Sequence, residues 1–305
     1  MSLLHIDNLN VSFRIKDDIF HVVKDFFIDV ESGDRIALVG ESGSGKSVVA
    51  SAIFGILERN AISDGSIVFD GRDLSGLTRT EFDLIRRKEM VLIPQNISQA
   101  WDPLIKIGKQ MMEFITASGI PKAEAKERAE EFLLKCGFEE PHKIMDTYPH
   151  RLSGGMSQRA MIAMCMSVRP KLVVADEPTK GLDESVRENV LDLLMSDEWN
   201  ASILMITHDI YSASRCERIM VMYSGRSVES GISSDVLGRP MHPYTKGLMD
   251  SEPSKGLKAI LFASRDIEPG ECSFANRCIY SDEKCTNDCI RYGDREVRCH
   301  RAGDL

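Results

Sequence analysis

The sequence has 305 residues, of which 43% are hydrophobic and 28% charged, a composition that excludes disordered and collagen-like chains. Forty-seven acidic and 38 basic side chains give a formal net charge of -9, which argues against broad attraction to nucleic acid or to an anionic membrane surface. No apolar run approaches the length needed to span a bilayer, and the first residues lack the pattern of a secretory signal. We therefore expect a globular protein of the cytosol.

The hydrophobic pattern predicts an α/β fold. Alternating apolar and polar residues predict half-buried strands at residues 4–13 and 22–30, which we interpret as an antiparallel flank. Four short, almost wholly apolar runs are typical of central strands in a parallel sheet covered by helices on both faces: residues 35–40, 90–93, 171–175 and 202–206. Helical patterns lie between them, at residues 46–57, 121–136, 156–168 and 185–195.

The order of these patterns also predicts the domain organisation. Residues of about 96–170 contain helical and turn patterns without a convincing strand, which indicates a helical subdomain inserted between two sheet strands. After the large domain of residues 1–230, the composition shifts to Pro, Gly, His and Cys, so we expect residues 231–305 to form a small separate module. Five of the eight cysteines lie there, and in a reducing compartment such crowding favours a metal site over disulfides.

A glycine-rich segment at residues 40–47 reads Gly-Glu-Ser-Gly-Ser-Gly-Lys-Ser, after an apolar strand and before a helix. This is the context of a phosphate-binding P-loop, because glycines let the backbone wrap the phosphates and the helix directs its N–H groups at them. Lys46 is expected to reach the β- and γ-phosphates, and Ser47 to bind Mg²⁺. The expected nucleotide contacts are Gly40, Glu41, Ser42, Gly43, Ser44, Gly45, Lys46, Ser47 and Val48.

Two further segments complete a candidate nucleotide site. Asp176 and Glu177 follow a buried strand, where Asp176 can hold Mg²⁺ through water and Glu177 can polarise the attacking water. Ser153, Gly154 and Gly155 stand directly before an apolar helix and offer a second phosphate-binding helix start. Taken alone, such a segment is most often a simple N-cap.

The order of the motifs resembles the nucleotide-binding subunit of ATP-binding cassette (ABC) transporters over essentially the whole chain. The resemblance implies a P-loop NTPase fold of the ABC type. It also implies the following assignments: residues 40–47 as Walker A, Gln95 as the Q-loop residue and a further Mg²⁺ ligand, residues 152–156 as the signature motif, Asp176 and Glu177 as Walker B with its catalytic glutamate, Asp183 as the D-loop and His208 as the switch histidine.

In that family two ATPase subunits dimerise head to tail, and the signature motif of one closes over the ATP of the other. The resemblance therefore implies a second ABC ATPase, two transmembrane permease subunits, an extracytoplasmic solute-binding protein and a place on the cytoplasmic face of the membrane. We expect the second ATPase to be a related chain, in a heterodimer, and we expect no nucleic-acid partner. The alternative is a soluble ABC ATPase with a regulatory or redox-sensing role.

The C-terminal part narrows the resemblance. The segments His242-Pro-Tyr-Thr-Lys246 and Pro269-Gly-Glu-Cys272 are similar to the di/oligopeptide and nickel branch of ABC importers, and both solutes stay open. The resemblance implies that four cysteines can hold a [4Fe-4S] cluster: Cys272, Cys278, Cys285 and Cys299. Zinc and free thiols remain alternatives, because the spacing is not a compact ferredoxin pattern and Cys289 offers a further thiol.

Three departures from the family pattern affect the assignments. Before Asp183 the chain reads Thr179-Lys-Gly-Leu182, where this branch usually has small or neutral residues before the leucine. Ile15 stands where many relatives stack an aromatic ring on adenine, so that stacking is either weaker or supplied by Phe13 or Phe20. The segment after Gln95 resembles the Q-loop region only loosely, and its Trp101 is either a contact to the membrane subunits or part of the core.

Overall fold

The computed structural model describes residues 2–251 and 270–303. The chain divides into two compact units. Unit 1 contains residues 31–34 and 73–205, and unit 2 contains residues 2–30, 35–72 and those from 206 onward. In the part of the chain that is described, no helix is both long and apolar enough to cross a bilayer.

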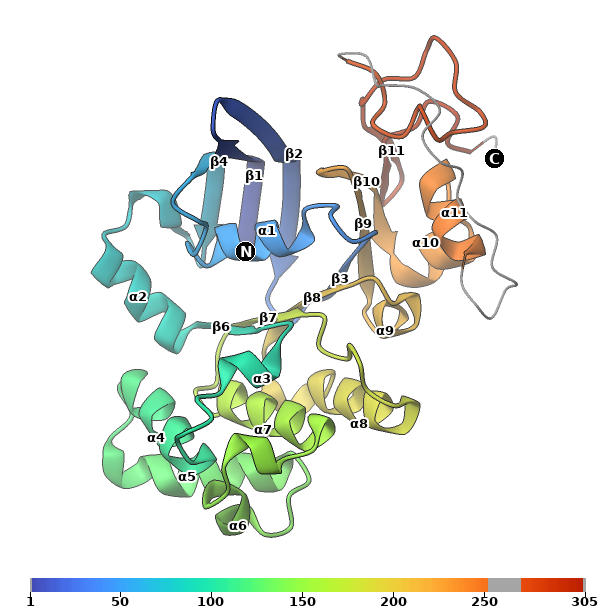
Figure 1. Cartoon of the computed structure of the whole chain (residues 1–305). Helices are drawn as coiled ribbons and strands as arrows, with labels where there is room; N and C mark the ends of the chain where they lie inside the picture. The colour runs from blue at the N-terminus through green and yellow to red at the C-terminus, as the bar shows by residue number, and fades with distance from the viewer. Residues whose placement is uncertain (1, 252–269, 304–305) are drawn as a thin grey trace. The chain divides into compact units, whose positions relative to one another are not determined.

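Unit 2 contains an antiparallel sheet, drawn in blue and cyan in Figure 1, which confirms the predicted flank. Its strands are β1 (Ser2–Ile15), β2 (Asp18–Glu31), β4 (Ala61–Phe69) and β5 (Arg72–Asp73), in the order β2-β1-β4-β5. β1 pairs with β4 from Leu4 opposite Phe69 to Phe13 opposite Ala61. β4 has no counterpart among the predicted strands, because Gly65 and its polar neighbours give a weak strand signal and cross-strand pairing with β1 decides the conformation.

Unit 2 also contains part of a second sheet, from which one strand leads into the glycine-rich loop. It contains β3 (Arg35–Val39), β9 (Arg218–Tyr223), β10 (Arg226–Ile232), β11 (Ile290–Tyr292) and β12 (Arg295–Val297), in the order β11-β12-β10-β9-β3. β3 runs parallel to β9, as expected for a central strand. β9 and β10 form a hairpin whose turn residues, Ser224 and Gly225, have positive φ angles of 47° and 87°, as a type I′ turn requires.

The helices of unit 2 are α1 (Lys46–Ile53), α9 (Ile210–Ser214), α10 (Ser233–Gly238) and α11 (Pro243–Asp250). The prediction that the first of them continues to residue 57 was wrong. Gly55 adopts a left-handed φ of 57°, and the Ile56 N–H donates to the Ser51 carbonyl at 2.9 Å. This six-to-one hydrogen bond is the Schellman ending of a helix, which Gly55 permits because it lacks a Cβ.

Unit 1 contains β6 (Met90–Ile93), β7 (Leu172–Asp176) and residues 202–205 of β8 (Ser202–Thr207), in the order β8-β7-β6. β6 and β7 are parallel, with Ile93 opposite Ala175. Every residue of β7 and β8 is buried. The apolar runs of the sequence were therefore interpreted correctly as central strands.

Helices and the turns that join them make up the rest of unit 1, and α4, α5, α6 and α7 pack against one another as the green group in Figure 1. The helices are α2 (Arg79–Lys88), α3 (Ile97–Ala100), α4 (Ile107–Ala117), α5 (Lys122–Lys135), α6 (Pro141–Met145), α7 (Gly154–Met166) and α8 (Glu184–Leu194). No strand lies between Asn96 and Arg169, all of which are described. Trp101 is 2% exposed, so it belongs to the core rather than to an exposed contact surface.

Candidate functional site

The glycine-rich loop of unit 2 wraps around the side chain of Lys46. The Lys46 ammonium donates to the carbonyls of Gly40 and Glu41 at 2.8 and 3.0 Å, and to the Ser44 hydroxyl at 3.3 Å. Lys46 is 6% exposed and begins α1, while Ser47 in the same first turn is exposed. A buried cation and the N–H groups of a helix start thus face the same loop, an arrangement suited to phosphate.

Two glycines are required here for different reasons. Gly45, the N-cap of α1, has φ of 102°, and a Cβ on it would lie 2.8 Å from the Val22 carbonyl oxygen. A Cβ on Gly40 would lie 2.1 Å from the Met222 carbonyl oxygen. The loop therefore keeps its path because neighbouring backbone from β2 and β9 leaves no room for side chains.

In unit 1, three predicted polar residues follow the carboxyl ends of neighbouring parallel strands. Gln95 comes two residues after β6, Asp176 ends β7, and Glu177 follows it. Because β6 and β7 are parallel and in register, these residues lie at the same edge of the sheet, where α/β proteins bind ligands. Asp176 is buried and Gln95 exposed. Glu177 has φ of 50°, a conformation that residues other than glycine seldom adopt and that is concentrated at functional sites.

Ser153 is the N-cap of α7, and its hydroxyl accepts a hydrogen bond from the Met156 N–H at 3.2 Å. The side chain is therefore a cap, as the simpler interpretation predicted, yet Ser153 and Gly154 are exposed and the helix start stays accessible. A Cβ on Gly155 would lie 2.4 Å from Val186 of α8. Asp183 is the exposed N-cap of α8 and lies three residues before Val186.

His208 directly follows β8 and is exposed at the start of unit 2's next helix. The adjacent Asp209 is the N-cap of α9 and accepts hydrogen bonds from the N–H groups of Tyr211 and Ser212, at 3.2 and 3.1 Å. This cap fixes the direction of the chain immediately after the histidine. The six predicted segments thus divide between the units: residues 40–48 and His208 belong to unit 2, and the other four belong to unit 1.

The segment His242-Pro-Tyr-Thr-Lys246 starts α11. The ring of His242 is buried and its Nδ1 accepts the Tyr244 N–H at 3.0 Å, while burial lowers the pKa of His242 to about 3, so the ring is neutral. Glu229 of β10, also buried, accepts the N–H groups of Met241 and His242 at 2.9 and 3.0 Å and forms an ion pair with Arg295. These contacts fix α11 against β10 and β12.

The four predicted cysteines, Cys272, Cys278, Cys285 and Cys299, line one cavity of about 20 Å³, room for about one water-sized group. Burial raises the pKa of Cys272 to about 11, with a smaller contribution from the other three thiols. Cys289 is exposed and does not line this cavity.

The spacing of metal-binding atoms around this cavity distinguishes between possible occupants. Among the described residues, the ligand atoms of Asp282, Cys285 and His300 lie within 4.8 Å of one another, whereas no three of the four cysteine sulfurs do. A tetrahedral zinc site with Zn–S bonds of about 2.3 Å places its sulfurs about 3.8 Å apart. The quartet is therefore not arranged as a closed four-cysteine zinc site.

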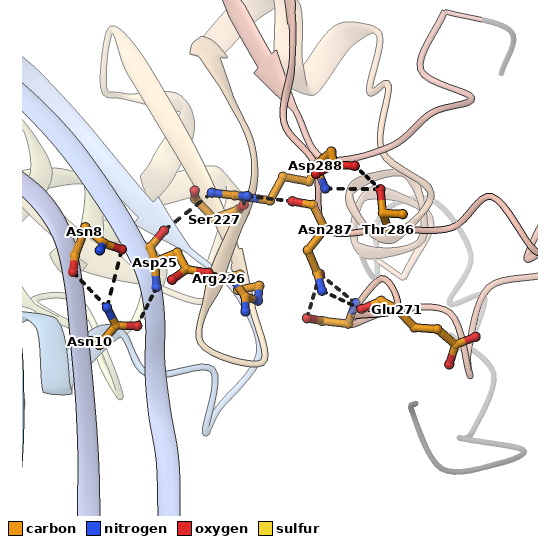
Figure 2. Close-up of polar contacts among 11 residues, drawn as sticks. Asn8, Asn10, Asp25, Arg226, Ser227, Glu271, Thr286, Asn287 and Asp288 are labelled. Atoms are coloured by element: carbon orange, nitrogen blue, oxygen red, sulfur yellow. Dashed lines mark hydrogen bonds and ion pairs between the residues drawn. The ribbon is translucent and has the colours of Figure 1, made fainter. Parts of the chain in front are cut away.

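An arginine ties the cysteine-bearing segment to the strands of unit 2. The guanidinium of Arg298 donates to the carbonyls of Ser227 at 2.8 Å, Asn287 at 2.6 Å and Asp25 at 3.4 Å. The carboxamide of Asn287 in turn donates to the Glu271 carbonyl, as Figure 2 shows. Arg298 thus joins carbonyls of β2 and β10 to a carbonyl of the segment that carries the thiols, and these charge-assisted hydrogen bonds hold that segment in place.

One predicted residue, Pro269, lies outside the described residues. Arg277 is not among the predicted residues, although its guanidinium donates two hydrogen bonds to the carboxylate of Glu41 in the glycine-rich loop. No local sequence pattern marks this residue, because its partner lies 236 positions earlier in the chain.

Comparison with known proteins agrees with this geometry. The model of the ABC transporter family matches residues 23–180, which contain the glycine-rich loop, Gln95, Ser153 and the Asp176-Glu177 pair. The chain therefore belongs to the ABC transporter family and is an ATPase. Within that family, residues 228–285 match the C-terminal region of oligopeptide/dipeptide transporters, and this region includes the segment that starts α11 and three of the four cysteines of the cavity.

Individual relatives cover almost the whole chain. It is 38% identical to the oligopeptide transport ATP-binding protein AppD of Bacillus subtilis over 98% of this chain and 96% of that protein. It is 37% identical to the dipeptide transport ATP-binding protein DppD of Haemophilus influenzae, with the same two coverages. A solved ATP-binding cassette, in a dimeric post-hydrolysis state with ADP and phosphate, matches 75% of this chain and 98% of its own, with a TM-score of 0.68 and 25% identity.

Proposed function

We propose that this protein is the ATP-hydrolysing subunit that energises an ABC importer for oligopeptides or dipeptides. The observation that carries the proposal is the joint match of the ATPase region and the C-terminal region to transporters of this branch. The relatives named for oligopeptide and dipeptide transport align over nearly the full chain, so the likeness is not limited to the ATPase core.

The proposed site assigns a role to each predicted residue. Lys46 and the backbone N–H groups of residues 40–48 bind the β- and γ-phosphates, and Ser47, Gln95 and Asp176 hold Mg²⁺, whose charge offsets that of the phosphates. These residues fit a hard cation, because they offer hydroxyl, amide and carboxylate oxygens. Glu177 accepts a proton from the attacking water, whose oxygen bonds to the γ-phosphorus as the bond to ADP breaks, and His208 positions the γ-phosphate.

A head-to-tail dimer follows from the same assignment. The helix start at Ser153, Gly154 and Gly155, of which the first two are exposed, is a second phosphate-binding surface, but the chain has one P-loop. We propose that these residues complete the nucleotide site of a partner ATPase, with Asp183 next to them at the dimer interface. We propose that the partner is a related chain rather than a second copy. A tagged subunit that copurifies only with copies of itself would contradict this proposal.

The proposed organisation places the ATPase domain in residues 1–230, with helices α3 to α7 as its helical subdomain at about 96–170, and a C-terminal module in residues 231–305. Two transmembrane permease subunits hold the protein on the cytoplasmic face of the membrane, and an extracytoplasmic binding protein delivers the solute. This arrangement assigns solute selectivity to the partners, since the ATPase domain offers sites for nucleotide.

Phe20 is the proposed adenine contact. Ile15 and Phe20 lie on either side of the β1–β2 turn, and their side chains are 52% and 51% exposed, whereas Phe13 is half-buried. Phe20→Ala is expected to raise the Kd for ATP about fivefold or more, because stacking of a base on an aromatic ring is worth about 1–3 kcal/mol. Equilibrium nucleotide binding checks this, with Phe27→Ala as the control, since Phe27 is 41% exposed on the same strand. Equal effects of the two changes would exclude a specific role of Phe20.

The four-cysteine cavity is proposed to hold a [4Fe-4S] cluster. Thiolates are the ligands such clusters use, and each binds a different iron atom, so sulfurs that are too far apart for one zinc ion suit a cluster. The cavity must widen to admit the cluster. Rotation about the Cα–Cβ bonds of the half-buried Cys278, Cys285 and Cys299 permits this widening. Arg298 and Asn287 hold the surrounding backbone during that change.

Metal analysis of the full chain, purified without oxygen, tests this. We expect about four iron atoms with acid-labile sulfide per chain. Cys285→Ser should lose both, and Cys289→Ser should retain them because Cys289 lies outside the cavity. Zinc in place of iron, lost on His300→Ala, would assign the metal to Asp282, Cys285 and His300 instead. A metal-free chain with five reactive C-terminal thiols would show that the cavity has no cofactor.

The solute is tested with the complex purified through this subunit and reconstituted in lipid with its binding protein. We expect short peptides to stimulate ATP hydrolysis, and chelated nickel, the other solute of this branch, to leave it unchanged. Stimulation by nickel alone would identify nickel, rather than a peptide, as the solute. If no membrane protein copurifies and neither solute acts, the transporter assignment fails, and the alternative of a soluble regulatory or redox-sensing ATPase takes its place.

A further inference from the structure

Glu41, the second residue of the P-loop, is bound through its N–H, its carbonyl and its carboxylate. Its carbonyl accepts from the Lys46 ammonium at 3.0 Å, within the loop. Its N–H donates to the Tyr244 hydroxyl at 2.9 Å, and its carboxylate accepts from both terminal nitrogens of Arg277 at 3.0 and 3.1 Å. Two of the three contacts therefore come from the C-terminal region, from residues more than 200 positions away in the sequence.

Arg277 is itself held in place. Its side chain is 18% exposed, and its guanidinium lies over the rings of Tyr223 and Phe274, 5.6 and 5.9 Å from their centroids. The rings of Tyr223, Tyr244 and Phe274 pack on one another, with centroids 4.6 to 5.5 Å apart. The hydrogen bond to Glu41 raises the pKa of Arg277 further above its usual range, so the guanidinium stays charged. A planar, bidentate ion pair on an aromatic base fixes direction as well as distance.

The same short segment carries the thiols. Arg277 directly precedes Cys278, and Phe274 lies two residues after Cys272 and lines the cysteine cavity. Tyr223 ends β9, the strand that pairs with β3, and β3 leads into the P-loop. The position of the P-loop's first turn is thus determined jointly by the central strands and by the cysteine-bearing segment.

We infer that Arg277 is a positioning residue for ATP, which acts with Tyr244 by holding Glu41 and through it the P-loop. The inference rests on the proposed assignment of residues 40–48 to phosphate binding. Held at Glu41, the loop presents the Lys46 ammonium and its N–H groups in one arrangement, so less freedom is lost when the phosphates bind. By thermodynamic linkage, bound ATP stabilises residues 272–278 to the same degree.

The test measures the Kd for ATP on the full chain. We expect Arg277→Ala to raise it about threefold to tenfold and Arg277→Lys to raise it less, since lysine keeps the charge without the planar fork. Arg291→Ala is the matched control, because Arg291 lies in the same region, is 75% exposed and pairs with Glu296. Glu41→Gln added to Arg277→Ala should weaken binding little further, because the two residues act as one unit.

A second measurement separates positioning from a purely structural role. Hydrogen exchange at residues 272–278 should slow when ATP binds to the native chain, and this protection should shrink in Arg277→Lys, a variant chosen to keep the fold. A lower melting temperature with an unchanged Kd would reduce Arg277 to an anchor of the C-terminal region and overturn the inference. If Lys46→Ala removes ATP binding while Arg277→Ala does not alter it, this inference fails and the P-loop assignment stands. If Lys46→Ala binds ATP normally, the P-loop assignment itself fails.

Discussion

Glu177→Gln is expected to lower ATP turnover by about a hundredfold to ten-thousandfold while leaving ATP binding close to native. The amide is nearly isosteric with the carboxylate but cannot accept the proton of the attacking water at neutral pH. Glu177 directly follows the buried end of β7, and its φ of 50° fixes the direction of its side chain from the strand. We therefore expect the change to affect the chemical step rather than nucleotide affinity.

Steady-state hydrolysis and equilibrium ATP binding on the same preparation check this prediction. The control is Glu127→Gln, which makes the same chemical change at an exposed position of α5 and should keep native turnover. In the proposed dimer, the Glu177 variant should also accumulate as an ATP-bound pair of subunits, because hydrolysis no longer releases them. Near-native turnover of Glu177→Gln would show that another group acts as the base.

Lys46→Ala should raise the Kd for ATP by about a hundredfold or more, because it removes the charge that a phosphate-binding loop places at the β- and γ-phosphates. The effect is expected to be large because Lys46 is 6% exposed and its ammonium is already oriented by Gly40, Glu41 and Ser44. Its charge acts in a partly desolvated site, where electrostatic attraction is stronger than in water.

Nucleotide binding and thermal unfolding should be measured together for this variant. A melting temperature close to native with lost ATP binding supports a binding role, and Lys109→Ala, which removes an exposed lysine of α4, serves as the control. Unchanged ATP affinity in Lys46→Ala would contradict the P-loop assignment. Lys46→Arg should not restore binding, because the space around the ammonium is enclosed by three oxygen acceptors.

Elements with a strong local signal could be predicted from the sequence. The apolar runs at 90–93 and 202–206 are buried strands, and the segment at residues 40–47 forms a loop around Lys46 before a helix, as its glycines and its lysine indicate. Ser153 caps a helix, as Ser before Gly-Gly predicts. In these cases, the hydrophobic period, the turn residues and the capping residues act over a few positions, so neighbouring residues suffice to determine the conformation.

Elements with conflicting local signals could not be predicted. β4 contains Gly65 and several polar residues, and pairing with β1 makes it a strand. Two other features do carry a local signal that the predicted elements leave out. Ser224-Gly225 forms the turn between β9 and β10, and Gly55 ends α1 at Ile53, four residues before the predicted end.

The sequence by itself determined the α/β class, the P-loop and the carboxylate pair after β7, since each depends on residue types at short spacing. The four cysteines were named from the family resemblance, and the structure showed that they share a cavity. The tertiary structure decided that Trp101 is buried, that no three of the four cysteine sulfurs lie within zinc-binding distance, and that Arg277 reaches Glu41. The physical reason is that these contacts join residues far apart in the chain. Their geometry is set by the packing of strands and aromatic rings between them, which no local pattern encodes.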